Sequence, residues 1–573
     1  MVTIEVNGRT IQAKPGEMLL AALRRASIHV PTLCNIDGLF PSGACRMCVV
    51  EVEGQRNLVP SCAFPVSDGM KVRTHTPRTV RARRTIIELL LANHPDDCLY
   101  CVRSGDCQLQ TLANDLGVRQ RRFKGERSMH HLDMSGPSIV RDQDKCILCG
   151  KCVRICDEVQ GVAAIDFVGR GSKTEVATTF NQGLNLSSCV NCGQCIKVCP
   201  TGALREQSDI KHVMTALNNP DLHVVVQHAP AVSVTLGELF GFKPGTDCLG
   251  LLNSALRRLG FNKVFDTSFS ADLTIMEEAS ELVQRLTTGG IVPMFTSCSP
   301  AWIKFMEQFY PDMLGHLSTC KSPQQMLGAV IKSYYAEREG IDPSKIFSVS
   351  VMPCTAKKFE SDRSEMGHGH GQDVDAVLTV RELARIITMR GIDFQSLEPE
   401  PADNPFGQRS TAGKLFGATG GVMEAAIRTA YFLVTGQELK DLKVQEVRGL
   451  EGVKEAHIQV GDLTLGVAVV SGLQNAHKIV QQVRDGRKDL HFIEVMSCPG
   501  GCIAGGGTPL GIDPADARAR MKALYDIDQK EIVRTSHSNE SVKRLYDEYL
   551  GKPLGEKSHH LLHTSYTSRE VVS

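Results

Sequence analysis

The sequence predicts a multidomain protein that combines α+β and α/β domains, and three observations support this. Its 573 residues exceed what one compact hydrophobic core organises, so several domains are expected. Fifteen of the 21 cysteines lie before residue 200, which separates a cysteine-rich first third from the remainder. Beyond about residue 209, short apolar runs alternate with helical stretches, a pattern typical of parallel sheets covered by helices.

Composition excludes several classes of function. Lys+Arg and Asp+Glu both total 64, there is one Trp, and aromatic residues make up 5%, so nothing indicates nucleic-acid binding. No run of about 18 uninterrupted apolar residues predicts a membrane span. The N-terminus lacks the apolar segment of a signal peptide, and an odd cysteine count fits a disulfide scaffold poorly. We therefore expect a reducing, cytoplasmic setting with thiolates as metal ligands.

Residues 1–78 combine strand-like segments, a helix at about 17–27 and loops that hold four cysteines. The spacing is C-x10-C-x2-C-x13-C. A structural zinc site is the alternative interpretation. The long first gap and the preceding β-grasp-like pattern resemble a plant-type [2Fe–2S] ferredoxin, although the first two cysteines are usually closer in that family. We predict a [2Fe–2S] ferredoxin-like domain over 1–78 with the ligands Cys34, Cys45, Cys48 and Cys62.

Residues 79–117 form a helical region interrupted by a His/Cys loop, His94-x3-Cys98-x2-Cys101-x5-Cys107. Three cysteines and one histidine suit zinc equally well when taken alone. Because the neighbouring modules are ferredoxin-like, we predict a His-ligated [4Fe–4S] cluster. An imidazole in place of a thiolate removes one negative charge and should raise the reduction potential.

Residues 137–208 contain an internal repeat of two cysteine blocks. Both blocks read C-x2-C-x2-C-x3-C, the spacing of bacterial two-cluster ferredoxins, in which the fourth cysteine ligates the other cluster. Two zinc sites are the alternative, but a repeat of this regularity is not expected for them. We predict two [4Fe–4S] clusters, one held by Cys146, Cys149, Cys152 and Cys199, the other by Cys189, Cys192, Cys195 and Cys156. Four clusters in one chain predict a one-electron relay that serves a two-electron site.

The region 209–525 is predicted to be the domain that carries this site. Sites in α/β folds follow the carboxyl ends of strands, and several cysteine motifs stand directly after apolar runs. A polar segment, 530–573, follows and ends in a short helix and a loop. The predicted strands are His223–Gln227, Val292–Phe295, Phe347–Val351, Leu465–Val470 and Phe492–Met496.

Three motifs in this region resemble the signatures TSCCPxW, MPCxxKxxE and ExMxCxxGCxxGGGxP of [FeFe]-hydrogenases. They are Thr296-Ser-Cys298-Ser299-Pro300-Ala-Trp302, Met352-Pro-Cys354-Thr-Ala-Lys357-Lys-Phe-Glu360 and Glu494-Val-Met496-Ser-Cys498-Pro-Gly-Gly-Cys502-Ile-Ala-Gly505-Gly-Gly507-Thr-Pro509. The resemblance covers essentially the whole chain, including the order of the four cluster modules and a small-subunit-like C-terminal segment. It implies a large two-lobed α/β hydrogenase domain and a catalytic subunit for the reversible reaction of two protons and two electrons to H2.

The resemblance also implies the cofactor, an H-cluster. This is a [4Fe–4S] cubane joined through a cysteine sulfur to a two-iron subcluster that carries CO, CN⁻ and an azadithiolate. Cys354, Cys498 and Cys502 match cubane ligands, with Cys502 as the bridging one. Lys357 matches a residue that donates a hydrogen bond to cyanide. An apolar cage around the two-iron subcluster is matched by Pro230, Met352, Phe416 and Met496.

The chain departs from the family pattern at one position. Where the family has two adjacent cysteines, a proton relay followed by a cubane ligand, this chain has Cys298 and Ser299. Either Ser299 ligates as an alkoxide, a hard ligand for iron–sulfur sites, or Cys298 becomes the ligand and Ser299 the relay. We favour Cys298 as the ligand because thiolate is the softer partner. Cys320 is a further candidate, but we interpret it, like Cys248, as a small buried apolar residue.

Proton delivery has candidates on one predicted helix. Glu278, Glu281 and Arg285 lie at i, i+3 and i+7 and therefore share a face. Without the resemblance a surface salt-bridge ladder is the preferred interpretation. With it, Glu278, Ser318 and Glu281 match the family's proton path and Arg285 its solvent end. A buried carboxylate with a raised pKa is a competent relay.

Three other functions share features with this sequence. An iron–sulfur assembly factor should lack the lysine-bearing and glycine-triplet motifs, which are complete here. The large iron–sulfur subunit of a quinone-reducing complex shares the layout of the first ~210 residues but not the last three motifs. An electron-relay subunit without an active two-iron centre stays open because of Ser299.

The expected partners follow from the resemblance and from one absent motif. No glycine-rich phosphate loop follows a strand and opens a helix, so NAD(P) and flavin are not expected on this chain. The chain is similar to catalytic subunits of NAD(P)-linked multi-subunit hydrogenases and to clostridial ferredoxin-linked hydrogenase. We therefore expect, besides H2 and protons, ferredoxin and/or flavin-containing NAD(P)-binding partner subunits, as well as maturation proteins.

Overall fold

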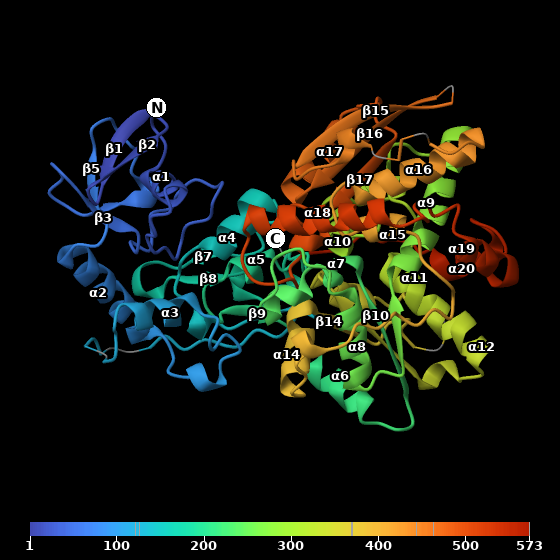
Figure 1. The fold of residues 1–573 in the computed structure, drawn as a ribbon, viewed down its shortest axis with the longest axis horizontal. Coiled ribbons are helices and arrows are strands. Elements are labelled where there is room, and N and C mark those ends of the chain that lie inside the picture. The colour runs from blue at the N-terminus through green and yellow to red at the C-terminus, as the bar shows by residue number, and fades with distance from the viewer. Residues whose placement is uncertain are drawn as a thin grey trace.

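The fold is described from a computed structural model of the chain. It describes residues 1–120, 122–124, 127–367, 369, 371–439, 441–442, 444–461 and 463–571. Figure 1 shows the N-terminal module (blue) at one end and the catalytic half (green to red) at the other, with the second cysteine-rich region (teal) between them. These three parts thus follow one another along the long axis in their order along the chain, although the C-terminus returns to the middle of the molecule.

The first module is a five-stranded sheet with one helix, as the β-grasp pattern predicts. Its strand order is β2-β1-β5-β3-β4, with β1 and β5 parallel and the other pairs antiparallel. Alternating residues such as Ile4, Val6 and Ile11 are buried, because a half-buried strand turns every second side chain to the core. The elements are β1 (Val2–Val6), β2 (Arg9–Ala13), α1 (Leu19–Arg25), β3 (Val49–Val52), β4 (Val59–Pro60) and β5 (Lys71–Arg73).

The next region contains two helices separated by the His/Cys loop. Helix α2 (Pro77–Asn93) begins where the Thr76 side chain accepts a hydrogen bond from the Thr79 backbone amide, a normal N-cap. It ends at the residue before His94, and α3 (Gln108–Asp115) begins directly after Cys107. The loop ligands are therefore held between two helix ends.

The internal repeat has the same local conformation in both cysteine blocks. Short helices α4 (Lys151–Arg154) and α5 (Gln194–Val198) each follow a glycine in the left-handed conformation, Gly150 at φ 74° and Gly193 at φ 70°. Two strand pairs frame the repeat. They are β6 (Ile139–Arg141) with β9 (Leu204–Glu206), and β7 (Asp166–Val168) with β8 (Glu175–Ala177).

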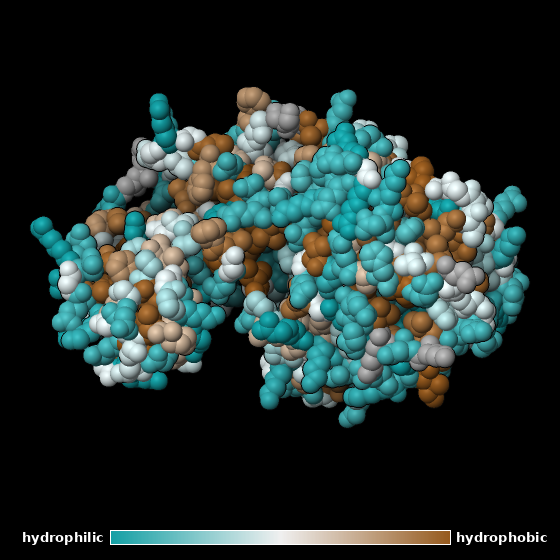
Figure 2. Space-filling view, turned by 90° about the horizontal axis from the view of Figure 1, so that it is seen from above, coloured by the Kyte–Doolittle hydropathy of each residue, from teal (hydrophilic) through white to brown (hydrophobic). Residues whose placement is uncertain are grey.

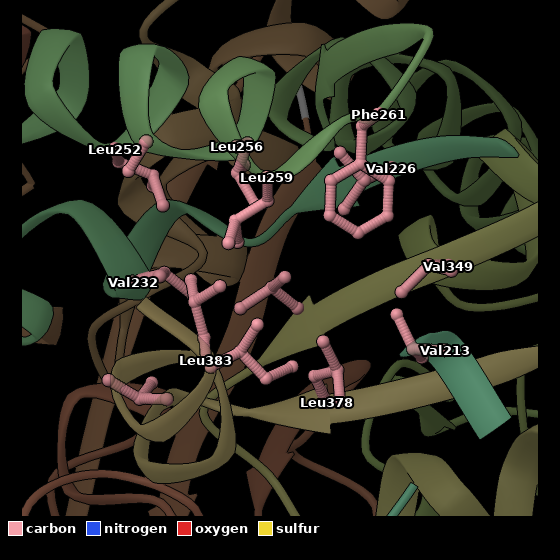
Figure 3. Packing of buried hydrophobic residues seen from close by; sticks show 14 of the residues in the cluster. Val213, Val226, Val232, Leu252, Leu256, Leu259, Phe261, Val349, Leu378 and Leu383 are labelled. Carbon is pink, nitrogen blue, oxygen red and sulfur yellow. The ribbon is translucent and has the colours of Figure 1, made fainter. Parts of the chain in front are cut away.

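The first sheet of the catalytic half is entirely parallel, in the order β11-β10-β13-β14. Strands β10, β13 and β14 are buried along nearly their whole length, as expected for a parallel sheet covered on both faces. In Figure 3, Leu252, Leu256 and Leu259 on the covering helix point toward Val226 and Val349 of the sheet. The elements are β10 (His223–His228), β11 (Lys263–Asp266), β13 (Ile346–Met352) and β14 (Ala376–Thr379), covered by α6 (Ile210–Leu217), α8 (Leu249–Leu259) and α14 (Val380–Met389).

The second sheet, in the order β12-β17-β16-β15, differs from the expected parallel arrangement at one edge. Strand β15 (Val453–Val460) runs antiparallel to β16 (Leu463–Ser471), because a two-residue connection cannot join parallel strands. The predicted strand 292–295 is reduced to β12 (Met294–Phe295), since Pro293 has no amide hydrogen for the ladder. Strand β17 (Phe492–Met496) has the predicted bounds and pairs in parallel with β12 and β16.

Helices surround these sheets and continue into the C-terminal segment. They are α7 (Pro230–Ser233), α9 (Ser268–Thr288), α10 (Pro300–Phe309), α11 (Pro323–Val330), α12 (Ala336–Glu339), α13 (Ala356–Ser361), α15 (Ala412–Leu415), α16 (Gly421–Thr435), α17 (Leu473–Arg484), α18 (Pro514–Lys530), α19 (Glu540–Leu545) and α20 (Glu556–Leu562). The part of the chain described here contains no helix long and apolar enough to cross a membrane. The face in Figure 2 mixes hydrophilic residues with scattered apolar patches.

Candidate metal centres and active-site cavity

A cavity lies where the loops after β10, β12, β13 and β17 meet. It contains about 820 Å³ not filled by protein atoms, open solvent included. The convergence follows from the fold, because loops at the carboxyl ends of parallel strands meet at one edge. The lining includes nearly all predicted H-cluster residues: Pro230, Cys298, Ser299, Met352, Cys354, Lys357, Phe416, Met496, Cys498 and Cys502.

Three cysteines in this lining influence one another electrostatically. Burial, followed by the charge of Cys498, raises the pKa of the Cys502 thiol to about 12. Burial, followed by the charges of Cys498 and Cys502, likewise raises the pKa of Cys354. Buried thiols so close together become thiolates only when a cation offsets their charge, which an iron–sulfur cubane supplies.

The backbone next to these thiols accepts only glycine. Gly501 has φ 91°, and a Cβ there would lie 2.6 Å from the Thr419 amide nitrogen. A Cβ on Gly505 would lie 2.2 Å from the Pro353 carbonyl oxygen. Without side chains the Cys502 loop can lie flat against the loop that carries Cys354. Three clustered thiols in an apolar cavity of this size fit the cubane and its bulky neighbour.

Cys298 and Ser299 both line the cavity but have different neighbours. Burial raises the pKa of Cys298, and the nearest charges acting on it are those of Glu278 and Cys502. The Ser299 hydroxyl lies 2.7 Å from the Ser497 hydroxyl, beside Cys498. Cys298 therefore lies between the cavity thiols and the acidic chain, whereas Ser299 lies on the side of Cys498.

Lys357 places a positively charged side chain in the cavity lining. Its ammonium group donates to the Glu360 carboxylate at 2.8 Å and to the Cys298 carbonyl at 3.2 Å. Helix α13, which starts just after the Cys354 loop, holds it there. A lysine on an otherwise apolar wall is suited to an anionic group inside the cavity.

The predicted proton-path residues lie together beside Cys298, and hydrogen bonds join three of them, Ser318, Glu281 and Arg285. The Ser318 hydroxyl donates to the Glu281 carboxylate at 2.8 Å, and Arg285 binds the other oxygen of Glu281 at 2.6 Å. Burial and the charge of Glu281 raise the pKa of Glu278 to about 8, so Glu278 stays protonated at neutral pH. Glu278, Glu281 and Ser318 are buried, so these residues do not form the surface salt-bridge ladder that the helix pattern alone would suggest.

The accessory cysteines form the groups that their spacing predicts, including the exchanged fourth cysteine. Cys146, Cys149, Cys152 and Cys199 line one small cavity. Burial, followed by the charge of Cys189, raises the pKa of Cys156 to about 12, so Cys156 belongs with the second block. The pKa of Cys195 is raised by burial and then by the charges of Cys192, Cys189 and Cys156.

The two remaining sets are also brought together locally. In the first module the Cys45 amide donates to the Cys34 sulfur at 3.5 Å. Hydrogen bonds between thiols, Cys34 with Cys45 and Cys48 with Cys62, lower the pKa of Cys34 and Cys48 and raise that of their partners. In the second, burial raises the pKa of Cys107, with Cys101 among the nearby charges, and His94 is buried at the end of α2.

The cysteine set of the first module and the His/Cys loop both lie against the set that contains Cys149. Burial lowers the pKa of Lys151, and the charges of Cys149 and Cys34 oppose this shift. Lys151 therefore lies between the sets that contain these two cysteines. A Cβ on Gly202 would lie 2.9 Å from the Cys101 sulfur, which places the His/Cys loop against the same block. Two branches therefore converge on the set that contains Cys149.

From the set that contains Cys149, the cysteine sets follow one another to the active-site cavity. The charge of Cys152 acts on Cys195, so the two ferredoxin-like sets adjoin. Cys192 lines the active-site cavity and has Cys498 as its first charged neighbour. The cysteine groups thus form a branched series that ends at the cavity.

Several residues of this site were not identified from the sequence. Ser497 and Gln324 line the cavity. Ser497 stands inside a quoted motif, one residue before Cys498, which could have singled it out. Gln324 lies outside the three motifs, so no sequence signal singles it out. Cys320, interpreted as a small buried residue, is indeed buried, but its sulfur also lies 3.8 Å from the Glu281 carboxylate.

Comparisons with known proteins agree with this arrangement. The matching family models are the iron only hydrogenase large subunit, C-terminal domain (222–506), a 2Fe-2S iron-sulfur cluster binding domain (1–77) and the iron hydrogenase small subunit (515–569). The NADH-ubiquinone oxidoreductase-G iron-sulfur binding region matches 83–122, and the NADH-quinone oxidoreductase subunit 3 ferredoxin-like domain matches 136–205.

Whole-length relatives and a solved structure extend the match. The chain is 48% identical to the NADP-reducing hydrogenase subunit HndD of Solidesulfovibrio fructosivorans, over 100% of this chain and 99% of that one. It is 40% identical to iron hydrogenase 1 of Clostridium pasteurianum, over 99% and 100%. An apo [FeFe]-hydrogenase structure from Chlamydomonas reinhardtii shares 44% identity, covers 64% of this chain and all of that one, and has a TM-score of 0.58.

A thiol-lined cavity that meets an iron–sulfur relay on one side and a buried acidic row on the other defines a redox enzyme that also handles protons. The chain belongs to the [FeFe]-hydrogenase family. It is a catalytic hydrogenase, an oxidoreductase acting on H2, with iron–sulfur cofactors of the 2Fe-2S and 4Fe-4S types.

Proposed function

We propose that the chain catalyses the reversible conversion of two protons and two electrons to H2 at an H-cluster held in the cavity between the two sheets. One observation carries this proposal: Cys354, Cys498 and Cys502 meet in an apolar cavity that touches both the relay and the acidic row. The two-iron subcluster, with its CO, CN⁻ and azadithiolate groups, would supply the metal position at which protons and electrons combine.

The residues around the cavity would hold and shield this group. Cys354, Cys498 and Cys502 are proposed cubane ligands, with Cys502 shared with the two-iron subcluster. Lys357 would bind a cyanide through its ammonium group. The apolar side chains would exclude water, which strengthens every electrostatic contact inside the cavity. This cage comprises Pro230, Met352, Phe416 and Met496.

The neighbours of Cys298 and Ser299 support one division of roles. Because Cys298 lies between Glu278 and the cavity, we propose that its thiol passes protons, while Ser299, beside Cys498, occupies the fourth ligand position. The softness of thiolate favours the reverse assignment, with Cys298 as the ligand. The two assignments are separated by the substitutions described in the Discussion.

Proton delivery would follow the row from the surface inward. Arg285 holds the outer oxygen of Glu281, Ser318 donates to the inner one, and Glu278 stays protonated at neutral pH. Hydrogen bonds join Arg285, Glu281 and Ser318, while Glu278 is linked to Glu281 and Cys298 through the effect of its charge, so protons would pass along this row from group to group. The row is thus proposed to connect solvent with Cys298.

The electron path is proposed to contain one [2Fe–2S] and three [4Fe–4S] clusters. Their modules would be 1–78, 79–117 and 137–208, followed by the H-cluster domain 209–525 and the small-subunit-like segment 530–573. The matched family ranges support this division, although the small-subunit model begins earlier, at residue 515. His94 would be the one non-thiolate ligand of the accessory clusters.

The electron partner is proposed to be a flavin-containing, NAD(P)-binding subunit in the cytoplasm. The supporting observation is the 48% identity to a subunit of an NADP-reducing hydrogenase over the full length of both chains. Ferredoxin is the other acceptor class, since the chain is also 40% identical to a clostridial iron hydrogenase. Dedicated maturation proteins would insert the two-iron subcluster.

Infrared and metal measurements on matured protein test the proposal. We expect CO and CN⁻ bands and about fourteen accessory irons per chain before any H-cluster iron is counted. Cys502→Ala should abolish hydrogen evolution and the infrared bands while the accessory clusters keep their EPR signals. Absence of the bands from fully matured wild type would instead support an electron-relay subunit without a two-iron centre.

A further inference from the structure

A second cluster of metal-ligating side chains lies behind the proton row, where the C-terminal segment packs on α9. One ligand atom each from Glu281, Cys320 and His563 lies within 4.8 Å of the other two, and all three residues are buried. Carboxylate, thiolate and imidazole are the three donor types that zinc binds in proteins. We propose that this cluster binds one divalent cation of the zinc type, and that the bound cation stops proton transfer through Glu281.

The backbone holds two of these donors side by side. Cys320 and His563 face each other in an antiparallel bridge, in which opposed side chains project from the same face. Two hydrogen bonds flank the bridge, from the Lys321 amide to the Leu562 carbonyl and from the Thr564 amide to the Thr319 carbonyl, both 2.8 Å. The pair is therefore preorganised by backbone pairing.

The spacing of the donors suits a tetrahedral ion. The Cys320 sulfur lies 3.8 Å from the Glu281 oxygen Oε2. Zinc–sulfur and zinc–oxygen bonds of ~2.3 and ~2.1 Å at a tetrahedral angle separate the two ligand atoms by about 3.6 Å. Small side-chain movements would thus close the site, and a fourth position would be left for water.

The surrounding groups provide the outer contacts that metal ligands usually have. His563 Nε2 lies 3.1 Å from a carboxylate oxygen of Glu277, the pairing that orients a metal-bound imidazole through its other nitrogen. That other nitrogen, Nδ1, lies 2.8 Å from the Thr319 hydroxyl, which an ion bound there would displace. Tyr546 donates to the other oxygen of Glu277 at 2.6 Å. Arg285 holds the oxygen of Glu281 that faces away from Cys320. All three donors are therefore oriented before any ion arrives.

A cation would reach the site from the surface of α20. Exposed His559 stacks on buried His563, with ring centroids 4.5 Å apart. Burial and the neighbouring acidic groups raise the pKa of Cys320, so the thiol keeps its proton until a cation replaces it. Zinc binding would then release a proton and occupy Oε2 of Glu281, the oxygen to which Ser318 donates at 2.8 Å.

The first test measures zinc itself, independently of hydrogen turnover. Anaerobic holoenzyme is incubated with zinc chloride and desalted; zinc and iron per chain are counted, and the zinc K-edge EXAFS is recorded. We expect about one added zinc with unchanged iron, one sulfur at ~2.3 Å and nitrogen or oxygen neighbours at ~2.0–2.2 Å. An all-sulfur shell, or no retained zinc, would overturn the proposal.

Variants locate the zinc. Cys320→Ala and, as an independent second variant, His563→Gln should each lose it, and Glu277→Gln should weaken binding by about 10–100-fold. Cys248→Ala is the matched control, because Cys248 is also a buried cysteine but lies in the core beside α8; it should bind zinc as wild type does. Equal zinc binding by Cys320→Ala and His563→Gln would refute the site.

The second test concerns inhibition, which rests on the proposed role of Glu281. Zinc should slow hydrogen evolution by wild type and Cys248→Ala but not by Cys320→Ala, each compared with its own zinc-free rate. Dithionite reduction of the accessory clusters should not change. Zinc that binds at Cys320 without slowing turnover would leave the site standing and would refute Glu281 as a relay.

Discussion

Glu278 and Glu281 lie one turn apart on α9, but only Glu281 contacts a cation, Arg285. Glu278 is fully buried and near the charge of Glu281, which raises its pKa to about 8. A carboxyl whose folded pKa is raised favours the folded state at low pH, and this stability is lost as the pH rises through about 8. The same ionisation removes the proton that Glu278 would donate.

The pH dependence of hydrogen evolution follows from this shift. We expect the wild-type rate to fall on the alkaline side near pH 8, while the acidic side is unaffected by this group. Glu278→Gln should slow the reaction by about 10²–10⁴-fold and lack the inflection near pH 8. Rates measured from pH 6 to 10 check this, and an unchanged inflection in the variant would contradict the assignment.

The adjacent pair, Cys298 and Ser299, gives a prediction with opposite outcomes for the two assignments. If Cys298 is the relay, Cys298→Ala keeps the cubane EPR signal and slows turnover by about 10²–10⁴-fold. Ser299→Ala then loses cubane occupancy, and Ser299→Cys, which restores the family motif, raises it. If Cys298 is the ligand, the effects of the two alanine variants exchange.

The catalytic domain and the last accessory cysteine group approach each other at a glycine. A Cβ on Gly506, in the loop after Cys502, would lie 2.3 Å from the Cys192 carbonyl oxygen and 2.8 Å from Gly193 Cα. Both contacts are with backbone, which cannot rotate away as a side chain can. This loop therefore sets how closely the catalytic domain meets the last accessory cysteine group.

Gly506→Ala should push these elements apart. Overpacking of this kind typically costs ~1–3 kcal/mol, so we expect a lower temperature of inactivation and slower electron transfer from the accessory clusters to the H-cluster. Gly136→Ala is the control, since its Cβ would meet nothing closer than 3.9 Å. If both variants have wild-type stability and transfer rates, the close approach has no functional importance.

Local spacing explains why the cysteine groups were predictable and other features were not. The C-x2-C-x2-C-x3-C blocks place their first three ligands within one loop and one helical turn, so that grouping needs little tertiary information, and the repeat itself predicts the exchange of the fourth cysteine. Strand β15 was not among the predicted strands, and its antiparallel direction departs from the expected parallel sheets because a two-residue connection sets it. The contact of Glu277 with His563 joins residues 286 positions apart, and no local pattern encodes it.

At the scale of the whole molecule, the cysteine groups form a branched path. The groups around Cys34 and Cys101 both adjoin the group of Cys149, and a single line continues through Cys195 to the cavity. Figure 1 agrees, since the blue and cyan modules reach the catalytic half through the teal region. Two branches in parallel can substitute for each other, whereas groups in series cannot.

This arrangement predicts how cluster losses combine. Cys48→Ala or Cys101→Ala, each removing one branch, should slow H2-dependent reduction of a protein acceptor without stopping it, because the other branch still conducts. Cys149→Ala should stop it, since both branches pass through that cluster. EPR of each variant confirms that only the intended cluster is lost, and hydrogen–deuterium exchange of the gas, which needs no external electron acceptor, serves as the control for an intact H-cluster. If Cys48→Ala alone abolishes reduction while exchange persists, the [2Fe–2S] module is the sole point of electron transfer and the groups act as an unbranched series.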